Sequence, residues 1–127
     1  MREIIIDEAN FSSVAEVHSF LADELSFPDY YGANLDALND CLGDVDEACK
    51  ISLYVDGPQG EEGELASWFP KLVRSFLRAS RENDELEVLV FVNTLASLER
   101  LLECKGMSDL LQSEDFTFQS LVTQSAL

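Results

Sequence analysis

The stretch PDYYGANLDALNDCL, residues 28–42, decides the fold because it places a tight loop directly before a helix. Pro28 and Gly32 interrupt regular structure, so they indicate a loop. Asn34 follows, and its side-chain oxygen is suited to accept a hydrogen bond from the free N–H groups at a helix start. Apolar residues then recur at helical spacing, at Leu35, Leu38 and Leu42. The pattern predicts a short helix with one apolar face.

Polar and charged side chains occupy the other surface of this helix. Asp36, Asn39 and Asp40 share that surface, because residues three and four apart on a helix are neighbours. Tyr30 and Tyr31 come just upstream. Two like charges four residues apart oppose helix formation by roughly a few tenths of a kcal/mol. The chemistry alone leaves two interpretations open: ordinary solvated charge that complements the helix dipole, or a surface that binds cations.

This stretch resembles the sequence signature of the barstar family of intracellular ribonuclease inhibitors. The shared features are the YYG turn, the NLDAL helix start and the DCL that follows. The resemblance extends from about residue 1 to residue 92. It implies the family's α/β fold, a small three-stranded parallel sheet packed with helices, here followed by a C-terminal extension.

The resemblance also implies a binding surface. In the family, the first turns of this helix and the preceding loop enter the active-site cleft of a guanyl-specific ribonuclease. Tyr30 matches the aromatic that packs on the catalytic region, and Asp36 and Asp40 match the carboxylates that pair with catalytic-site cations. An ionised carboxylate on a rigid helix then takes the place of the RNA phosphate. The candidate partner-binding residues are Tyr30, Tyr31, Gly32, Asn34, Asp36, Asn39, Asp40 and Arg78.

Three departures from the family pattern bear on the target. Asn39 stands where the best-known member has a tryptophan, and the loop after Leu42 lacks the tryptophan found there. Arg78 lies where the next long helix carries a further contacting glutamate. A cation here would either neutralise Asp36 or Asp40 internally or face a different enzyme surface. Inhibition as a class is therefore better supported than any particular ribonuclease.

The chain is strongly acidic: its 127 residues carry a formal net charge of −17. The apolar fraction of 46% is nevertheless enough for one domain with a modest core. Such a charge repels phosphate backbones and anionic membranes and attracts cationic proteins, which argues against nucleic acid and membranes as partners. No Lys or Arg lies between Arg2 and Lys50, so the first half is the anionic pole.

The sequence contains no arrangement typical of an enzyme or a cofactor site. It has no Gly-rich phosphate loop and no nucleophile paired with a base. The single histidine, His18, lies among apolar positions of a predicted helix and is interpreted as structural. Asp44, Asp46 and Glu47 lack the spacing of a calcium loop, so they are interpreted as a solvated acidic loop and not as a metal site.

The cysteines and the absence of a leader pattern predict a cytoplasmic location. Cys41, Cys49 and Cys104 are odd in number and have no metal-ligand spacing. No charged-then-apolar leader opens the printed chain, and no apolar run approaches the length of a membrane span. A reducing compartment is therefore expected.

Three apolar runs predict strands, at residues 3–7, 51–55 and 86–92. The last, LEVLVFV, is almost wholly apolar and is expected to be buried between neighbours. Helical crossovers between the strands imply a parallel sheet. The first crossover helix is expected to be capped by Ser12 or Ser13 and to end before Pro28.

The best amphipathic pattern lies between the second and third strands, after a loop marked by Pro58 and several glycines. Pro70 lacks an N–H group, so a separate turn is expected before it and a helix from there to about Asn83. Trp68 is expected to lie in the core.

The sequence predicts a barstar-like domain at residues 1–93 and an extension at residues 94–127. The core is expected to be complete at Val92. The extension is expected to be helical and to pack on the domain, with a helix from Ala96 to Gly106 and a strand or helix from Phe116 to Val122. It also offers a route to self-association.

These features predict a stoichiometric inhibitor of a small, basic, secreted ribonuclease of the guanyl-specific type, with the role of an immunity protein. The acidic helix and loop would block the phosphate pocket of the enzyme. The alternative is a non-inhibitory regulatory module of the same fold, whose acidic surface meets another basic protein.

Overall fold

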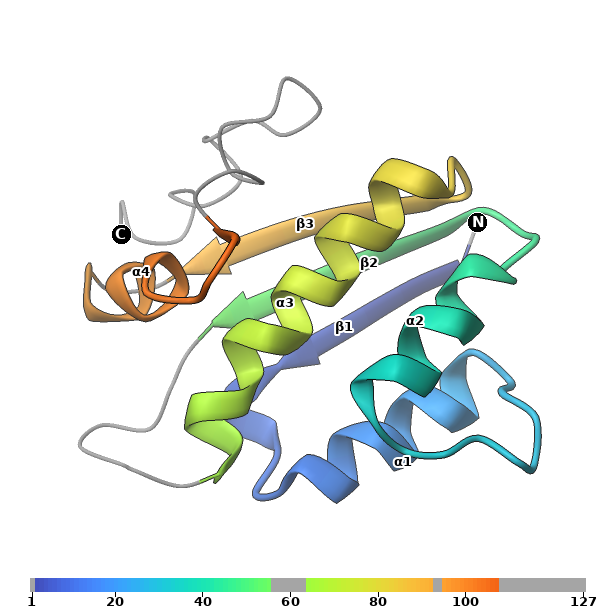
Figure 1. Cartoon of the computed structure of the whole chain (residues 1–127), viewed down its shortest axis with the longest axis horizontal. Helices are drawn as coiled ribbons and strands as arrows, with labels where there is room; N and C mark the ends of the chain where they lie inside the picture. Colours follow the sequence, from blue (N-terminus) through green and yellow to red (C-terminus); the bar gives the residue numbers. More distant parts are fainter. Residues whose placement is uncertain (1, 56–63, 93–94, 108–127) are drawn as a thin grey trace.

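The computed structural model describes residues 2–55, 64–92 and 95–107 of the chain (Figure 1). Its strands and helices are β1 (Arg2–Asp7), the short 3-10 helix η1 (Glu8–Asn10), α1 (Val14–Glu24), α2 (Leu35–Gly43), β2 (Cys49–Val55), α3 (Glu64–Glu82), β3 (Leu86–Val92) and α4 (Leu95–Leu102). The predicted loop around Pro58 and the predicted element at Phe116–Val122 lie outside the described residues.

The three strands form a parallel sheet in the order β1-β2-β3. In the register of the sheet, Ile51 of β2 pairs with Ile4 on one side and with Val88 on the other. Figure 1 shows α3 running across one face of the sheet with α1 and α2 beside it, and both of these helices contact α3. The α/β fold expected from the sequence is confirmed.

Burial alternates along the central strand because successive side chains point to opposite faces. Ile51, Leu53 and Val55 of β2 have no exposed surface. The opposite face is less covered in the described part of the chain. There, Ile5 is 61% exposed, and the rings of Tyr54 and Phe91 stack with their centroids 4.8 Å apart.

The expectation that β3 is buried between neighbours is not met among the three described strands, because β2 occupies the centre and β3 lies at an edge of the sheet that they form. The apolar composition of β3 has another explanation. Val90 and Val92 are buried, whereas Leu89 and Phe91, which alternate with them, are only partly covered. An apolar strand therefore does not by itself indicate a central position in a sheet.

The first crossover helix is capped by Ser13, one of the two serines considered. Ser13 Oγ accepts a hydrogen bond from Glu16 N at 3.2 Å. The Glu16 carboxylate returns to Ser12, accepting from its backbone N at 2.7 Å and from its hydroxyl at 2.6 Å. Two neighbouring serines thus satisfy different hydrogen bonds at the start of α1.

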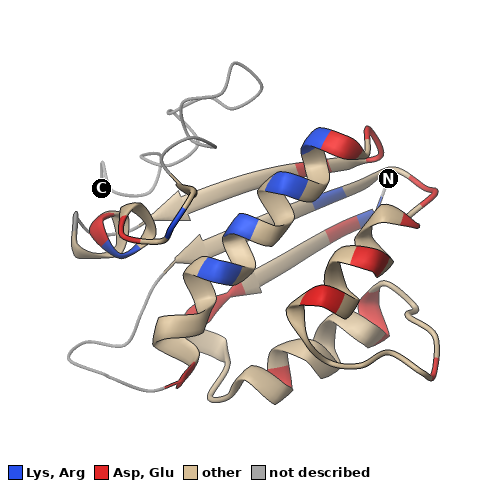
Figure 2. Cartoon of the chain, in the orientation of Figure 1, with Lys and Arg blue, Asp and Glu red and all other residues tan. Residues whose placement is uncertain are grey.

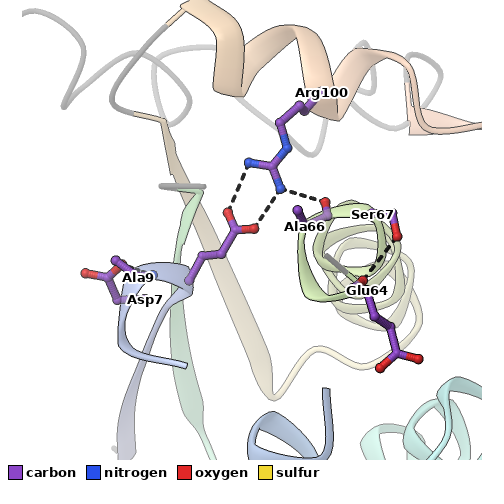
Figure 3. A network of polar contacts seen from close by, with 7 residues as sticks. Asp7, Ala9, Glu64, Ala66, Ser67 and Arg100 are labelled. Carbon is purple, nitrogen blue, oxygen red and sulfur yellow. Dashed lines mark hydrogen bonds and ion pairs between the residues drawn. The ribbon is translucent and has the colours of Figure 1, made fainter. Parts of the chain in front are cut away.

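A second correction concerns Pro70, which lies inside the continuous helix α3 and does not begin a new one. A proline has no N–H to donate to the carbonyl four residues earlier, which here belongs to Ala66. That carbonyl accepts a hydrogen bond from Arg100 Nη2 of α4 at 2.7 Å (Figure 3). The helix therefore passes through Pro70 with the vacated acceptor satisfied from another element.

Arg100 also forms a bidentate ion pair with Glu8 of η1. Its Nη1 donates to Glu8 Oε1 at 3.2 Å, and its Nη2 donates to Oε2 at 2.6 Å. The Glu8 side chain is fully buried, and that of Arg100 is 26% exposed. One guanidinium thus joins the first turn of α3, the segment after β1, and α4.

The apolar core extends beyond Val92, which corrects the expectation that it ends there. Leu101 and Met107 have no exposed surface and belong to the same cluster as the buried side chains of the sheet. The helix α4 ends at Leu102, earlier than expected, and Gly106 follows with a φ of +83°, in the left-handed region that glycine adopts freely. Both α4 and the turn after it contribute to the folded core.

Candidate functional site

The loop before α2 is held by the side chain that caps the helix. Asn34 Oδ1 accepts a hydrogen bond from Ala37 N at 2.8 Å, which confirms the predicted cap. Asn34 Nδ2 donates to the Gly32 carbonyl at 3.3 Å. A Cβ atom at Gly32 would lie 3.2 Å from Asn34 Nδ2, so a larger residue would crowd the cap. One asparagine therefore fixes both the loop and the start of α2.

Charged and polar side chains of α2 face solvent. Asp36, Asn39 and Asp40 are exposed, whereas Leu38 and Leu42 have no exposed surface. Within the described ranges, neither aspartate has a side-chain hydrogen bond or an ion pair. Two carboxylates that lack a cation of their own are available to a cationic partner.

The two loop tyrosines lie in different environments. Tyr30 is 88% exposed. Tyr31 is partly buried: its ring packs on Phe27 with centroids 4.8 Å apart, and its hydroxyl is hydrogen-bonded to His18 Nδ1 at 2.5 Å. Tyr30 is therefore open to contact, while Tyr31 holds the loop from the inside.

His18 is buried beneath the loop, in agreement with its interpretation as structural. Its ring meets Trp68 of α3 edge-on, with centroids 5.2 Å apart. Burial lowers the pKa of His18. Burial, with a smaller contribution from Cys41, raises the pKa of Tyr31 to about 12. Both rings are thus uncharged at neutral pH, and a neutral hydrogen bond connects the loop to α1.

The far end of α2 is held by a side chain from beyond α3. Asn83 Nδ2 donates to the Leu42 carbonyl at 2.9 Å and to the Val45 carbonyl at 3.0 Å. Asn83 Oδ1 accepts from Glu85 N at 3.0 Å. The last carbonyls of a helix have no partner within the helix, so this amide satisfies one of them and ties α2 to the turn before β3. The helix is fixed at both ends.

A cavity of about 560 Å³ lies beside the acidic end of α2. Its lining includes Tyr30 and Asp40, the acidic loop residues Asp44, Asp46 and Glu47, and the apolar Leu25, Phe27 and Val45. The three loop carboxylates are exposed, as expected for a solvated loop. That they lie beside Tyr30 was not predicted, because the loop that carries Tyr30 meets them only in the folded chain.

Arg78 is exposed on α3, the helix that contacts α2 and whose Lys and Arg residues are blue in Figure 2. In the part of the chain that the structure describes, it forms no ion pair with Asp36 or Asp40. Among the described residues, Arg78 therefore does not neutralise these aspartates internally. Its guanidinium lies instead beside Gly106, in the turn after α4.

No metal or nucleophilic centre accompanies this surface in residues 2–55, 64–92 and 95–107. Their His, Cys, Asp and Glu side chains form no group of three suited to a metal ion. Burial raises the pKa of the Cys41 and Cys49 thiols, which keeps them protonated and weakly nucleophilic at neutral pH. None of the helices in these ranges is long and apolar enough to cross a membrane.

Comparisons with known proteins cover the residues that build this surface. The family model for Barstar (barnase inhibitor) matches residues 1–94, which include β1 to β3 and end just before α4. The chain is also 38% identical over 92 residues to a Bacillus subtilis (strain 168) protein named "Putative ribonuclease inhibitor YrdF". That match covers 71% of this chain and 99% of the relative. The chain belongs to the barstar family.

Proposed function

We propose that this protein is a stoichiometric inhibitor of a small basic ribonuclease of the guanyl-specific, secreted type. The proposal rests on Asp36 and Asp40 of α2, a helix that is held at both ends. Both side chains are exposed, and neither forms an ion pair with any residue that the structure describes. The family match and the name of the Bacillus subtilis relative support the class of target.

In the proposed complex, Asp40 occupies the place where basic side chains of the enzyme hold the RNA phosphate. A carboxylate that is fixed before binding loses little conformational freedom, so more of its charge-assisted hydrogen bonding contributes to affinity. Tyr30 packs over the catalytic region. Tyr31 and Asn34 hold the loop in position, and Gly32 allows its close approach to the enzyme.

Charge outside the contact surface favours encounter with a basic enzyme. The net charge of −17 attracts such an enzyme from beyond contact distance. Asn39 and the cationic Arg78 distinguish this surface from that of the best-known family member, so the target presents a polar group to the first and an acidic or neutral group to the second. In the proposed role the protein is a cytoplasmic immunity protein, because an inhibitor of this kind protects the RNA of its own cell.

Titration of a purified guanyl-specific ribonuclease tests the proposal. The initial rate of RNA cleavage is measured while this protein is added. Because occupation of the cleft needs no turnover, activity should fall linearly and reach its minimum at one equivalent. The variant Asp40→Asn keeps the shape of the side chain and removes its charge, so its titration should lose the sharp end point.

Two results would contradict the proposal. Loss of activity that continues with time at sub-stoichiometric amounts would mean that the enzyme is being degraded. Full activity at an excess of this protein, with a complex still detected by size-exclusion chromatography, would favour the non-inhibitory module.

A further inference from the structure

Five of the eight Lys and Arg residues lie along α3 or in the turn after α4. They are Lys71, Arg74, Arg78, Arg81 and Lys105, called here the basic row. Figure 2 shows its α3 members as successive bands along the helix. In the described ranges none of the five forms an ion pair, although the chain has 25 acidic residues. The basic row thus lacks an anionic partner there.

A groove of about 360 Å³ lies between α3 and the segment that contains α4, beside the basic row. Its lining includes Lys71, Arg74 and Lys105 of the row, Glu103, and the apolar Ala66 and Pro70. The groove therefore combines positive charge with apolar surface. This combination fits a peptide segment that carries both carboxylates and aliphatic side chains.

The described chain ends directly beside the basic row. Arg74 Nη1 donates to the Lys105 carbonyl at 2.7 Å. A Cβ atom at Gly106 would lie 2.9 Å from Arg78 Nη2, so the backbone at this glycine contacts the guanidinium. Met107 follows and is fully buried. The described range therefore ends, at Met107, one residue beyond the glycine that contacts Arg78.

The sequence that follows has the complementary composition. Residues 108–115 read SDLLQSED, and residues 108–127 contain no Lys or Arg. An extended chain covers about 3.5 Å per residue, so these eight residues reach up to roughly 28 Å. The row from Lys71 to Arg81 spans ten residues of helix, or about 15 Å. The acidic segment is therefore long enough to cover the row.

We propose that residues 109–115 of this chain dock along the basic row and into the groove between α3 and α4. Their carboxylates pair with Lys71, Arg74 and Arg78, and their two leucines pack on the apolar lining. A second copy is a less favourable occupant, because two molecules of net charge −17 repel each other. A tethered segment binds at an effective concentration on the order of millimolar and meets no such repulsion.

Docking neutralises the basic row on α3, the helix that α2 contacts. The acidic surface offered to a basic partner then continues from α2 across α3. The docking itself depends only on contacts within one chain, so it holds or fails independently of ribonuclease inhibition.

Zero-length crosslinking of the full chain with a carbodiimide, followed by peptide mass spectrometry, tests the docking. The reagent joins a carboxylate to a contacting lysine, and the lysines of this chain are Lys50, Lys71 and Lys105. We expect links from Glu114 or Asp115 to Lys71 at several times the yield of links to Lys50, which lies on β2 and serves as the internal reference. A mixture of isotopically light and heavy protein distinguishes links within a chain from links between chains.

Two variants sharpen the result. The double variant R78Q/R81Q weakens the basic row but leaves Arg74 bonded to the turn after α4, and should lower the yield of the Lys71 link several-fold. Arg2→Gln removes a cation of β1 that pairs with Glu24 and Glu47 outside the row, and should leave that yield unchanged. Equal yields at Lys71 and Lys50 would overturn the proposal. Links that appear only between light and heavy chains would overturn it too, by assigning the row to a second copy.

Discussion

Glu8 and Asp40 are carboxylates of equal charge in opposite environments. The Glu8 side chain is fully buried, and Arg100 holds both of its oxygens. Asp40 is exposed on α2 and forms no ion pair with any other described residue. The molecule supplies the cation for Glu8 and leaves Asp40 without one. Burial and internal pairing, and not the sign of the charge, therefore distinguish an acid that stabilises the fold from one available for binding.

The two carboxylates also depend on different parts of the chain. Asp40 and the residues that support its helix lie within residues 1–94, which the family model matches. Arg100, the partner of Glu8, lies beyond them on α4. The candidate binding surface thus belongs to the family domain, while a cation that the domain needs for a buried acid comes from the segment that follows it.

Arg100→Ala should have the largest effect on stability. The change leaves the Glu8 carboxylate buried without its cation and the Ala66 carbonyl without its donor. We therefore expect the free energy of unfolding to fall by about 3–5 kcal/mol, measured by urea denaturation followed by circular dichroism. Arg81→Ala, which removes an exposed arginine, is the matched control and should change stability by less than about 0.5 kcal/mol. If Arg100→Ala lowered the free energy of unfolding as little as Arg81→Ala does, Glu8 would not need its internal cation.

Asp40→Ala should show the opposite result, with unchanged stability and weak binding. Loss of the Asp40 carboxylate would leave desolvated cations of the enzyme unpaired. The binding free energy for the ribonuclease should therefore weaken by about 2–5 kcal/mol, mainly through faster dissociation. This magnitude is informed by charge pairs measured in the barstar family itself. Asp46→Ala in the acidic loop should cost less than about 1 kcal/mol and act on association. Surface plasmon resonance measures both rates. Equal losses of affinity in Asp40→Ala and Asp46→Ala would mean that the net charge of the protein, and not the position of Asp40, drives binding.

A smaller effect should come from His18, which is buried like Glu8 but is bonded to a neutral tyrosine. Because burial lowers its pKa, the unfolded chain binds a proton first as the pH falls. The contribution to stability is complete above the ordinary histidine value of about 6.5 and is lost as the pH falls toward the lowered value. Urea unfolding of the protein and of His18→Gln between about pH 5 and pH 8 measures it. If the free energy of unfolding of the variant falls just as steeply at acidic pH, the loss of stability comes from carboxylates and not from His18.

The sequence predicted the candidate surface well because its determinants are local. The cap at Asn34 and the burial of Leu38 and Leu42 follow from residues within a few positions of one another. Helical spacing alone placed Asp36 and Asp40 on the solvent side. The binding roles of these residues stay predictions.

The expectations for Pro70 and β3 failed because they depend on contacts between distant parts of the chain. Nothing near Pro70 in the sequence indicates that a guanidinium 34 positions beyond Ala66 takes up its carbonyl. The position of β3 at the sheet edge depends on strand order, which hydrophobicity does not encode. The spacing of apolar residues indicated that His18 is buried, but gave no sign that it holds Tyr31 of the binding loop.

Glu8 and Arg100 are synthesised far apart in time. They lie 92 positions apart, so at about 5–20 residues per second the arginine is added to the chain roughly 5–18 s after the glutamate. The helix α2, complete at Gly43, is made well before the midpoint of that interval. A nascent chain therefore carries its acidic helix for several seconds before the cation that holds Glu8 exists. The molecule reaches its full stability only when translation has passed α4.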